Sequence, residues 1–574
     1  MAKFASKHPV CRNPGFVASE CGSLTVLGLM FFVCMLMIAG ISIDMMIFEN
    51  SRTRLQNLAD RASLAAADMQ QALKPADIVS SYFQTAGMDQ YLDDVQVVDS
   101  FAERSVLITA SNRQRTMFMN MTGVDELMPK ALSQAMEGIG DIEISLVLDV
   151  SGSMGWPSSA AGSKSKLHEL KSAAKTFVDT VYAGDIPGRI TTTVVPYSTQ
   201  VNAGPAILAQ LNATQEHQSS SCVEFEPADF ATTQLADTQL LQRAGHFDMW
   251  SSMSRNSRWA CRIEASNEIR PMLDDPGAIK SRIDALSAEG QTSTDLGLKW
   301  GAAFLDPAMR SVMARLNGVA PEDQLRPVDF DGVEASKFVV LLTDGINTTH
   351  KKLRPPFLGG GSYLWKYLPQ PGEIGFVTTE KTKKKDDLSD PILSVYLPER
   401  GDEDGDGISN EPYWVPSIET EDGNEIKAHW VAVPFGQPVY GLPSIDTGPD
   451  ADVPFNVFQL SWPEVWATMP PKYFAETFIK AARGSSSDYN DFMNKVWTDV
   501  TGTEKDSRTQ AACDALKAQR VTVFSIGFEV DDHAAEVMEG CASTPNHFIR
   551  AVGDDLGDAF NAIATNISTL RLTQ

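Results

Sequence analysis

A short apolar run that ends in one carboxylate and two hydroxyl groups limits the possible folds of this chain. Residues 144–148 are followed by Asp149, Ser151 and Ser153. The run is too short for a helix and is bounded by Gly and Ser, so it predicts a buried strand of a parallel sheet. Open α/β sheets bind ligands just beyond the carboxyl ends of their strands. Three closely spaced oxygen donors suit a hard cation such as Mg²⁺.

The flanking residues predict an α/β fold with a mostly parallel sheet. A helix is expected at 164–181, because its apolar residues share one face, and a β-rich run follows at 189–195. Strand, helix and strand in this order form a βαβ unit. Residues 337–345 contain a second apolar strand, which ends in Asp344. Further helices are expected at 271–288, 507–520, 533–541 and 555–570, and further strands at 521–528 and 547–552.

Two long insertions interrupt this pattern, at 198–270 and at 350–503. Loops of such length are normally functional or locally folded. A bridge between Cys222 and Cys261 would hold the first insertion. The second is rich in Pro, Gly and aromatic residues and contains a basic cluster, Lys381 to Lys385, which is expected to be a solvated loop.

The second insertion also contains half of a calcium-loop pattern. Asp402, Asp404 and Asp406 precede Gly407, and Asn410 takes the ninth position of such a loop. The twelfth position is a tyrosine where a bidentate Glu is expected. A bound Ca²⁺ that stiffens the insertion and a solvated acidic turn therefore both stay open.

Composition excludes one class of partner and suggests a compartment. The 574 residues predict two to four domains, and the net charge of −26 argues against nucleic acid, because phosphate binding requires basic patches. Among the seven cysteines no Cys-x-x-Cys occurs, which argues against zinc or redox sites. The four downstream cysteines predict two disulfides in an oxidising compartment. The second pair, after Cys222 and Cys261, is Cys513 and Cys541, which lie on the helices expected on either side of the 521–528 strand. Free buried thiols are the alternative for this pair.

The N-terminal part predicts a membrane anchor. No residue from Gly22 to Ile43 is charged, and 22 helical residues span about 33 Å, enough to cross a bilayer. A cleaved secretory signal is the alternative, although its apolar core would be shorter. Basic residues before the segment favour a cytoplasmic tail at 1–21. An apolar stripe continues the helix to residue 74, where Pro75 is expected to end it.

The sequence Gly15-Phe16-Val17-Ala18-Ser19-Glu20 resembles a type IV prepilin processing site, with Gly15, Phe16 and Glu20 as its defining residues. An uncleaved tail is the open alternative. Residues 75–140 are interpreted as a small connector with paired strands at 95–98 and 105–109.

Residues 141–574 resemble a von Willebrand factor A domain. Asp149, Ser151, Ser153, Thr292 and Asp344 match the metal-ion-dependent adhesion site of that family, in family order. By this resemblance, Ser151, Ser153 and Thr292 offer hydroxyls to Mg²⁺ or Mn²⁺, and the two aspartates act directly or through water. An intact but empty site, or serines that only cap a helix, are the structural alternatives.

Enzyme motifs are missing from the sequence. It has no Gly-x-x-x-x-Gly-Lys-Ser/Thr loop for a nucleotide, no Gly-x-Ser-x-Gly elbow and no His-Glu-x-x-His. His168 and His533 are interpreted as helix-surface residues. A metal-dependent hydrolase is accordingly the least favoured hypothesis.

The whole chain is similar to TadG-type Flp pilus-assembly proteins, which join a TadE/TadG-like helix to a C-terminal von Willebrand domain. Residues 22–27 and 54–67 carry the N-terminal resemblance, and 513–515, 525–528, 541–543 and 570–573 the C-terminal one. It implies a single-pass protein of the bacterial inner membrane, with its C-terminal domain in the periplasm or outside. The expected role is non-enzymatic, metal-dependent binding of an acidic side chain of a protein partner in pilus assembly or adhesion. A processed, minor pilin-like subunit or tip adhesin is the alternative.

Overall fold

A computed structural model divides the chain into two compact units, with the boundary in the sequence between residues 139 and 140. Each unit is described by itself. The structure describes residues 23–68, 73–99, 103–138, 141–159, 162, 164–183, 188–320, 324–330, 335–367, 376–377, 392–397, 412–420, 425–431 and 457–573.

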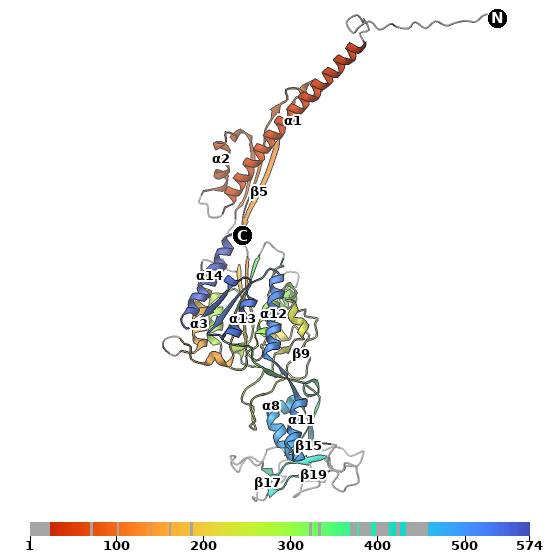
Figure 1. Cartoon of the computed structure of the whole chain (residues 1–574), viewed down its shortest axis with the longest axis vertical. Coiled ribbons are helices and arrows are strands. Elements are labelled where there is room, and N and C mark those ends of the chain that lie inside the picture. The colour runs from red at the N-terminus through yellow and green to blue at the C-terminus, as the bar shows by residue number, and fades with distance from the viewer. Residues whose placement is uncertain are drawn as a thin grey trace, which may run out of the picture. The chain divides into compact units, whose positions relative to one another are not determined.

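In the first unit, a long helix packs against an antiparallel sheet (Figure 1). The second half of α1 (Ser23–Ala67) has a buried stripe that includes Leu55, Ala59 and Ala62. The stripe forms one core with Val106 and Ile108. The remaining elements are α2 (Pro75–Thr85), β1 (Leu92–Asp99), β2 (Glu103–Ser111) and β5 (Lys130–Gly138), with strand order β1-β2-β5.

The predicted end of the first helix is wrong. α1 ends at Ala67, and Pro75 instead occupies the first position of α2. Proline suits that position, since its missing N–H would have no helical partner there. The predicted pairing of strands in this region is confirmed by the antiparallel register of β1 with β2. Within the described residues, one helix, Leu24–Ala67, is long and apolar enough to cross a membrane.

One carboxylate on α1 holds a hairpin against the helix. The hairpin consists of β3 (Gln114–Arg115), β4 (Glu126–Leu127) and a 3₁₀ turn between them (Met119–Thr122). Asp44, which is 4% exposed, accepts hydrogen bonds from the backbone N–H groups of Met117, Phe118 and Met119, at 3.0, 2.7 and 2.7 Å. Hydrogen bonds to a charged acceptor are stronger than those between neutral groups.

We expect Asp44→Ala to release this hairpin. The amide hydrogens of Met117, Phe118 and Met119 should then exchange at least tenfold faster, because each loses its acceptor. Hydrogen exchange read by mass spectrometry on the detergent-solubilised chain measures this change. Asp93→Ala, at an exposed aspartate of the same unit, is the control. Unchanged exchange at the three amides would contradict the role of Asp44.

The second unit is built on a six-stranded sheet with the order β10-β7-β6-β11-β22-β23. The strands are β6 (Asp141–Asp149), β7 (Ile190–Tyr197), β10 (Arg270–Leu273), β11 (Ala335–Thr343), β22 (Thr522–Phe528) and β23 (Phe548–Ala551). All pairs are parallel except that of β10 with β7 at one edge. This sheet confirms the predicted α/β class, with its mostly parallel strands.

Helices cover both faces of the sheet (Figure 1). Side chains alternate along the strands, so Val147 and Leu146 enter different cores. One core receives α6 (Thr294–Ala303), α12 (Gly502–Ala518) and α13 (Asp532–Cys541). The other receives α3 (Lys166–Val181), α5 (Pro276–Ala285) and α14 (Asp555–Thr573). The prediction of a helix at 271–288 is wrong for its first residues, which form the edge strand β10, whereas the helix α5 begins at Pro276.

The first insertion is folded onto the sheet domain. Its elements include α4 (Pro205–Leu208), β8 (Val223–Glu224) and β9 (Gln242–Arg243). Phe225 and Phe230 are buried in the same core as Val147. The predicted disulfides between Cys222 and Cys261 and between Cys513 and Cys541 are both formed.

The second insertion is a module on a two-stranded stem, and its core also includes Phe247, Met249 and Ala260 of the first insertion. The stem is the antiparallel pair of β12 (His350–Leu353) and β21 (Trp497–Val500). A five-stranded sheet has the order β19-β16-β15-β13-β20, and its aromatic core contains Trp462, Trp466, Phe474 and Phe492. The strands of this sheet and the remaining elements of the module are β13 (Gly361–Tyr367), β14 (Phe376–Val377), β15 (Ile392–Tyr396), β16 (Tyr413–Val415), β17 (Ile418–Thr420), β18 (Glu425–Ile426), β19 (His429–Val431), β20 (Val457–Ser461), α8 (Trp462–Thr468), α9 (Pro471–Phe474), α10 (Ala481–Arg483) and α11 (Ser486–Val496).

Candidate metal centre

The five residues singled out in the sequence lie at the carboxyl edge of the sheet. Asp149 is the last residue of β6, and Asp344 follows the last residue of the neighbouring parallel strand β11. Thr292 lies two residues before α6. Parallel neighbours end at the same edge, which explains why residues 195 positions apart in the sequence share one site.

Hydrogen bonds connect four of the five residues. Ser153 Oγ donates to Asp344 Oδ1 at 2.6 Å, and the Ser151 and Ser153 hydroxyl oxygens are 3.0 Å apart. The backbone N–H of Ser151 donates to Asp149 Oδ1 at 2.7 Å. Thr343 Oγ1 donates to the other carboxylate oxygen of Asp149, also at 2.7 Å. Both aspartates are therefore oriented by groups of the two adjoining strand ends.

The Thr292 loop is placed against this group by its backbone. The N–H of Gly152 donates to the carbonyl of Gly290 at 3.0 Å. A Cβ atom at Gly152 would lie 3.2 Å from that carbonyl oxygen, so a side chain there would crowd the contact. Thr292 itself is 4% exposed.

Burial makes the carboxylate pair costly in the absence of a cation. Burial, and next the charge of Asp344, raise the pKa of Asp149 to about 7. Lys166 Nζ forms an ion pair with Asp344 Oδ2 at 3.1 Å, and this buried oxygen accepts no hydrogen bond. A carboxylate oxygen with unused acceptor capacity is suited to a cation.

The donor set fits a divalent cation. Two carboxylates and neutral hydroxyls are hard oxygen ligands of the kind that Mg²⁺ and Mn²⁺ prefer. In the described part of the chain no cluster of three or more His, Cys, Asp or Glu side chains occurs. This site has two such residues, and its further donors are hydroxyls.

We expect the free energy of unfolding to fall as pH rises from about 4 to about 7 in excess chelator. Over this range the raised pKa of Asp149 makes the folded chain bind more protons than the unfolded chain, so rising pH favours unfolding. The full effect is on the order of 4 kcal/mol. Denaturant titrations at several pH values measure it. Asp149→Asn should remove this slope, whereas Ser151→Ala should keep it, and an unchanged slope in Asp149→Asn would contradict the assignment.

No pattern in the sequence indicated that Lys166 belongs to the site. It is the first residue of α3, and its ammonium also lies 3.7 Å from Glu529 Oε2. Glu529 in turn accepts hydrogen bonds from Ser158 and Ser159. A basic residue in the first turn of a helix is electrostatically unfavourable. This unfavourable placement is the feature of the sequence that could have indicated a special role for Lys166.

Lys505 is the second residue that the sequence did not reveal. Its fully buried ammonium donates to the carbonyl of Thr292 at 2.8 Å, to Ser293 Oγ at 2.7 Å and to the carbonyl of Thr348 at 2.6 Å. Burial lowers its pKa to about 8. Thr348 Oγ1 accepts the backbone N–H of Thr292 at 2.9 Å, and Asn347 Oδ1 accepts that of Thr294 at 2.8 Å.

These contacts attach the Thr292 loop to the base of the second insertion. Thr348 lies two residues before β12, and Lys505 lies five residues after β21. Both ends of the stem therefore hold the same loop of the candidate metal centre.

We expect Lys505→Met to lower the free energy of unfolding by about 2–4 kcal/mol, because two buried carbonyls and one hydroxyl lose their donor. Hydrogen exchange of the Thr292 and Ser293 amides should also accelerate. Lys517→Met, at a partly exposed position of the same helix, is the control and should change stability by less than about 0.5 kcal/mol. Equal effects of the two variants would contradict a specific role for Lys505.

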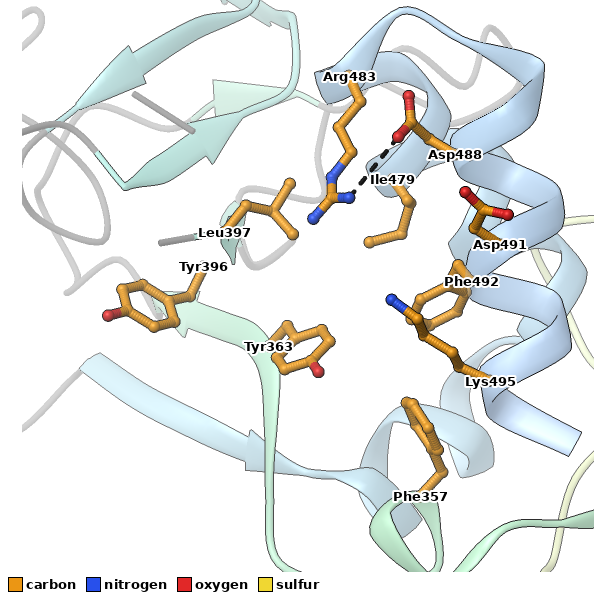
Figure 2. Close-up of a pocket in the computed structure, with 10 residues that line it drawn as sticks. All are labelled: Phe357, Tyr363, Tyr396, Leu397, Ile479, Arg483, Asp488, Asp491, Phe492 and Lys495. Carbon is orange, nitrogen blue, oxygen red and sulfur yellow. Dashed lines mark ion pairs between the residues drawn. The ribbon is translucent and has the colours of Figure 1, made fainter. Parts of the chain in front are cut away.

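A separate pocket of about 130 Å³ lies in the second insertion (Figure 2). Tyr363 and Tyr396 lie across it from Asp491 and Lys495, two residues of α11. A cavity of about 150 Å³ holds one benzene ring, so this pocket has room for a single ring or side chain. It shares no residue with the candidate metal centre.

Of the other residues singled out in the sequence, only some lie within the described part of the chain. Gly15, Phe16 and Glu20, the basic cluster at 381–385 and the calcium-loop residues Asp402, Asp404, Asp406 and Asn410 lie outside the described residues. His168 and His533 are exposed on helices, and His533 Nε2 lies 3.0 Å from Asp506 Oδ2.

The mostly parallel sheet, its antiparallel edge strand and the group of residues at its carboxyl edge resemble a von Willebrand factor A domain. At the N-terminus, residues 22–70 match the family described as "Putative Flp pilus-assembly TadE/G-like". The first unit thus begins with a TadE/G-like segment. A search of curated proteins gave no match to the chain.

Several solved structures of pilus proteins are similar to the chain. The von Willebrand domain of the type V pili tip protein Mfa5 from Porphyromonas gingivalis has 15% identity and a TM-score of 0.29, over 75% of this chain and 96% of its own. The pilus adhesin SpaC from Lactobacillus rhamnosus GG has 12% identity and a TM-score of 0.27, over 83% and 34%. The PilB minor pilin from Streptococcus sanguinis has 13% identity and a TM-score of 0.25, over 84% and 78%. This chain therefore spans about a third of SpaC.

Proposed function

We propose that this protein is a membrane-anchored, non-enzymatic component of a Tad-type pilus system that binds a protein partner through a divalent cation. The hydrogen-bonded group of Asp149, Ser151, Ser153 and Asp344 at the sheet edge is the observation that carries the proposal. The TadE/G-like segment at residues 22–70 supports the pilus context.

The residues present suggest how the site would work. Ser151, Ser153 and Thr292 would supply neutral hydroxyls, and the two aspartates would supply the negative charge. Mg²⁺ or Mn²⁺, when bound, would act as an electrophile toward an acidic side chain of the partner. Asp344 is already paired with Ser153 and faces Lys166, so this chain's own groups hold its carboxylate in a fixed orientation.

The insertions are proposed to select the partner. The second insertion carries the pocket beside Tyr363 and Lys495 and is attached at its stem to the Thr292 loop. The pocket offers a second position at which a side chain of the partner would bind. A Ca²⁺ site at Asp402 to Asn410 remains part of the proposal for this insertion.

We propose that the anchor places the second unit in the periplasm or outside the cell, with a single pass through the inner membrane. The disulfides Cys222–Cys261 and Cys513–Cys541 support an oxidising compartment for that unit.

We expect Asp149→Ala to lower the affinity of the detergent-solubilised chain for Mg²⁺ and Mn²⁺ by at least tenfold, because one of two carboxylates is lost. Isothermal titration calorimetry measures this. Asp274→Ala, at an exposed aspartate of the same unit, is the control. Partner capture from an envelope fraction should require the cation and be lost in Asp149→Ala. Capture that persists in excess chelator would contradict metal-dependent binding.

A minor pilin-like subunit is the second candidate function. A long N-terminal helix packed on the sheet β1-β2-β5 is the observation that favours it. Mass spectrometry of the mature N-terminus decides the question, since processing at Gly15 gives a chain that begins at Phe16, whereas an unprocessed chain begins at Met1 or Ala2.

A further inference from the structure

We infer that the β3–β4 hairpin of the first unit is a second membrane contact, which rests in the interfacial layer of a lipid bilayer beside α1. The inference rests on the membrane anchoring in the proposed function. It adds a lipid-binding surface outside the helix itself.

The hairpin tip exposes apolar side chains. Met117 is 69% exposed, Phe118 40% and Met121 71%, all within one loop. Single exposed apolar residues are common on proteins, but several gathered on one loop indicate an interaction surface. Thr116, Asn120 and Thr122 alternate with them and supply polar groups. Such a mixture suits the boundary between headgroups and acyl chains.

Contacts with α1 fix the height of the loop along the helix. Phe118 packs on Gly40, where a Cβ atom would lie only 2.6 Å from Cγ of the phenylalanine ring. Gly40 lies inside the uncharged segment that ends at Ile43. Asp44, the residue after Ile43, accepts hydrogen bonds from the backbone N–H groups of the same loop. Four helical residues rise about 6 Å, so the loop lies where the uncharged segment meets its first charge.

The covering of Asp44 supports a lipid neighbour. A carboxylate at the edge of a hydrocarbon layer is costly unless its oxygens are hydrogen-bonded. Three N–H groups satisfy Asp44 and leave it 4% exposed. The residues that donate to Asp44 also carry exposed apolar side chains or lie next to them. The contact between the hairpin and Asp44 therefore shields the charge and also presents an apolar surface. α1 itself exposes apolar side chains at the two positions that follow Asp44, Met45 and Met46.

Photo-crosslinking of the full chain tests this inference. A benzophenone amino acid replaces Met121 in protein reconstituted into vesicles of phosphatidylethanolamine and phosphatidylglycerol, and adducts are identified by mass spectrometry. Leu27 in α1 is the positive control, and Met253, which is 72% exposed in the second unit, is the negative control. We expect lipid adducts at positions 121 and 27, and at least fivefold fewer at position 253.

Three results would overturn the inference. Lipid adducts at position 27 without adducts at 121 would place the loop in water. Crosslinks from 121 to a second copy of the chain, in place of lipid, would make the surface a contact between subunits. A lack of adducts at position 27 would show that α1 is not embedded, and the anchoring would fail together with this inference, whereas metal binding would be unaffected.

A glycine pair provides a matched test of the packing. Gly40→Leu should displace Phe118 and lower the lipid adducts at position 121 several-fold. Gly28→Leu should leave them unchanged, because no atom lies within 4 Å of a Cβ at Gly28. Equal adduct yields in both variants would show that the loop is not held at this height by Gly40.

Discussion

The parallel pairing of β6 with β11 is the constraint on which the second unit depends. It brings Asp149 and Asp344 to one edge of the sheet, where burial alone would make two carboxylates unfavourable. The hydroxyls of Ser153 and Thr343 and the ammonium of Lys166 offset that cost without removing it. The fold thus holds a buried acidic pair in place, and a cation is the simplest group that would satisfy it.

Much of the sheet could be predicted, because its strands are short apolar runs with polar ends and its helices have clear apolar faces. The candidate site followed from the strand ends and from a family resemblance. Other features depended on tertiary contacts that no local pattern carries. Glu143 lies inside the apolar run of β6 and is balanced by Lys337, 194 residues away, at 2.8 Å. Pro75 suits the start of a helix as well as its end, so the boundary of α1 was misplaced.

Lys166 and Lys505 illustrate the same limit within the site. Lys505 looks like an ordinary surface lysine in the sequence, and Lys166 differs only by its place in the first turn of a helix. Both are nevertheless buried against residues of the candidate centre. Their role depends on which loop the fold brings to them. The second insertion could be recognised as long and aromatic, but not as a module with its own sheet, since its strands are short and widely separated in sequence.

The stem of that module has a mechanical consequence. β12 and β21 leave the sheet domain side by side, so a pull on the module acts on both strands in the same direction and does not slide one past the other. Tension then reaches Thr348 and Lys505, the two residues that hold the Thr292 loop. A pull on the module would therefore strain the Thr292 loop, so the geometry of the candidate metal centre would depend on applied force.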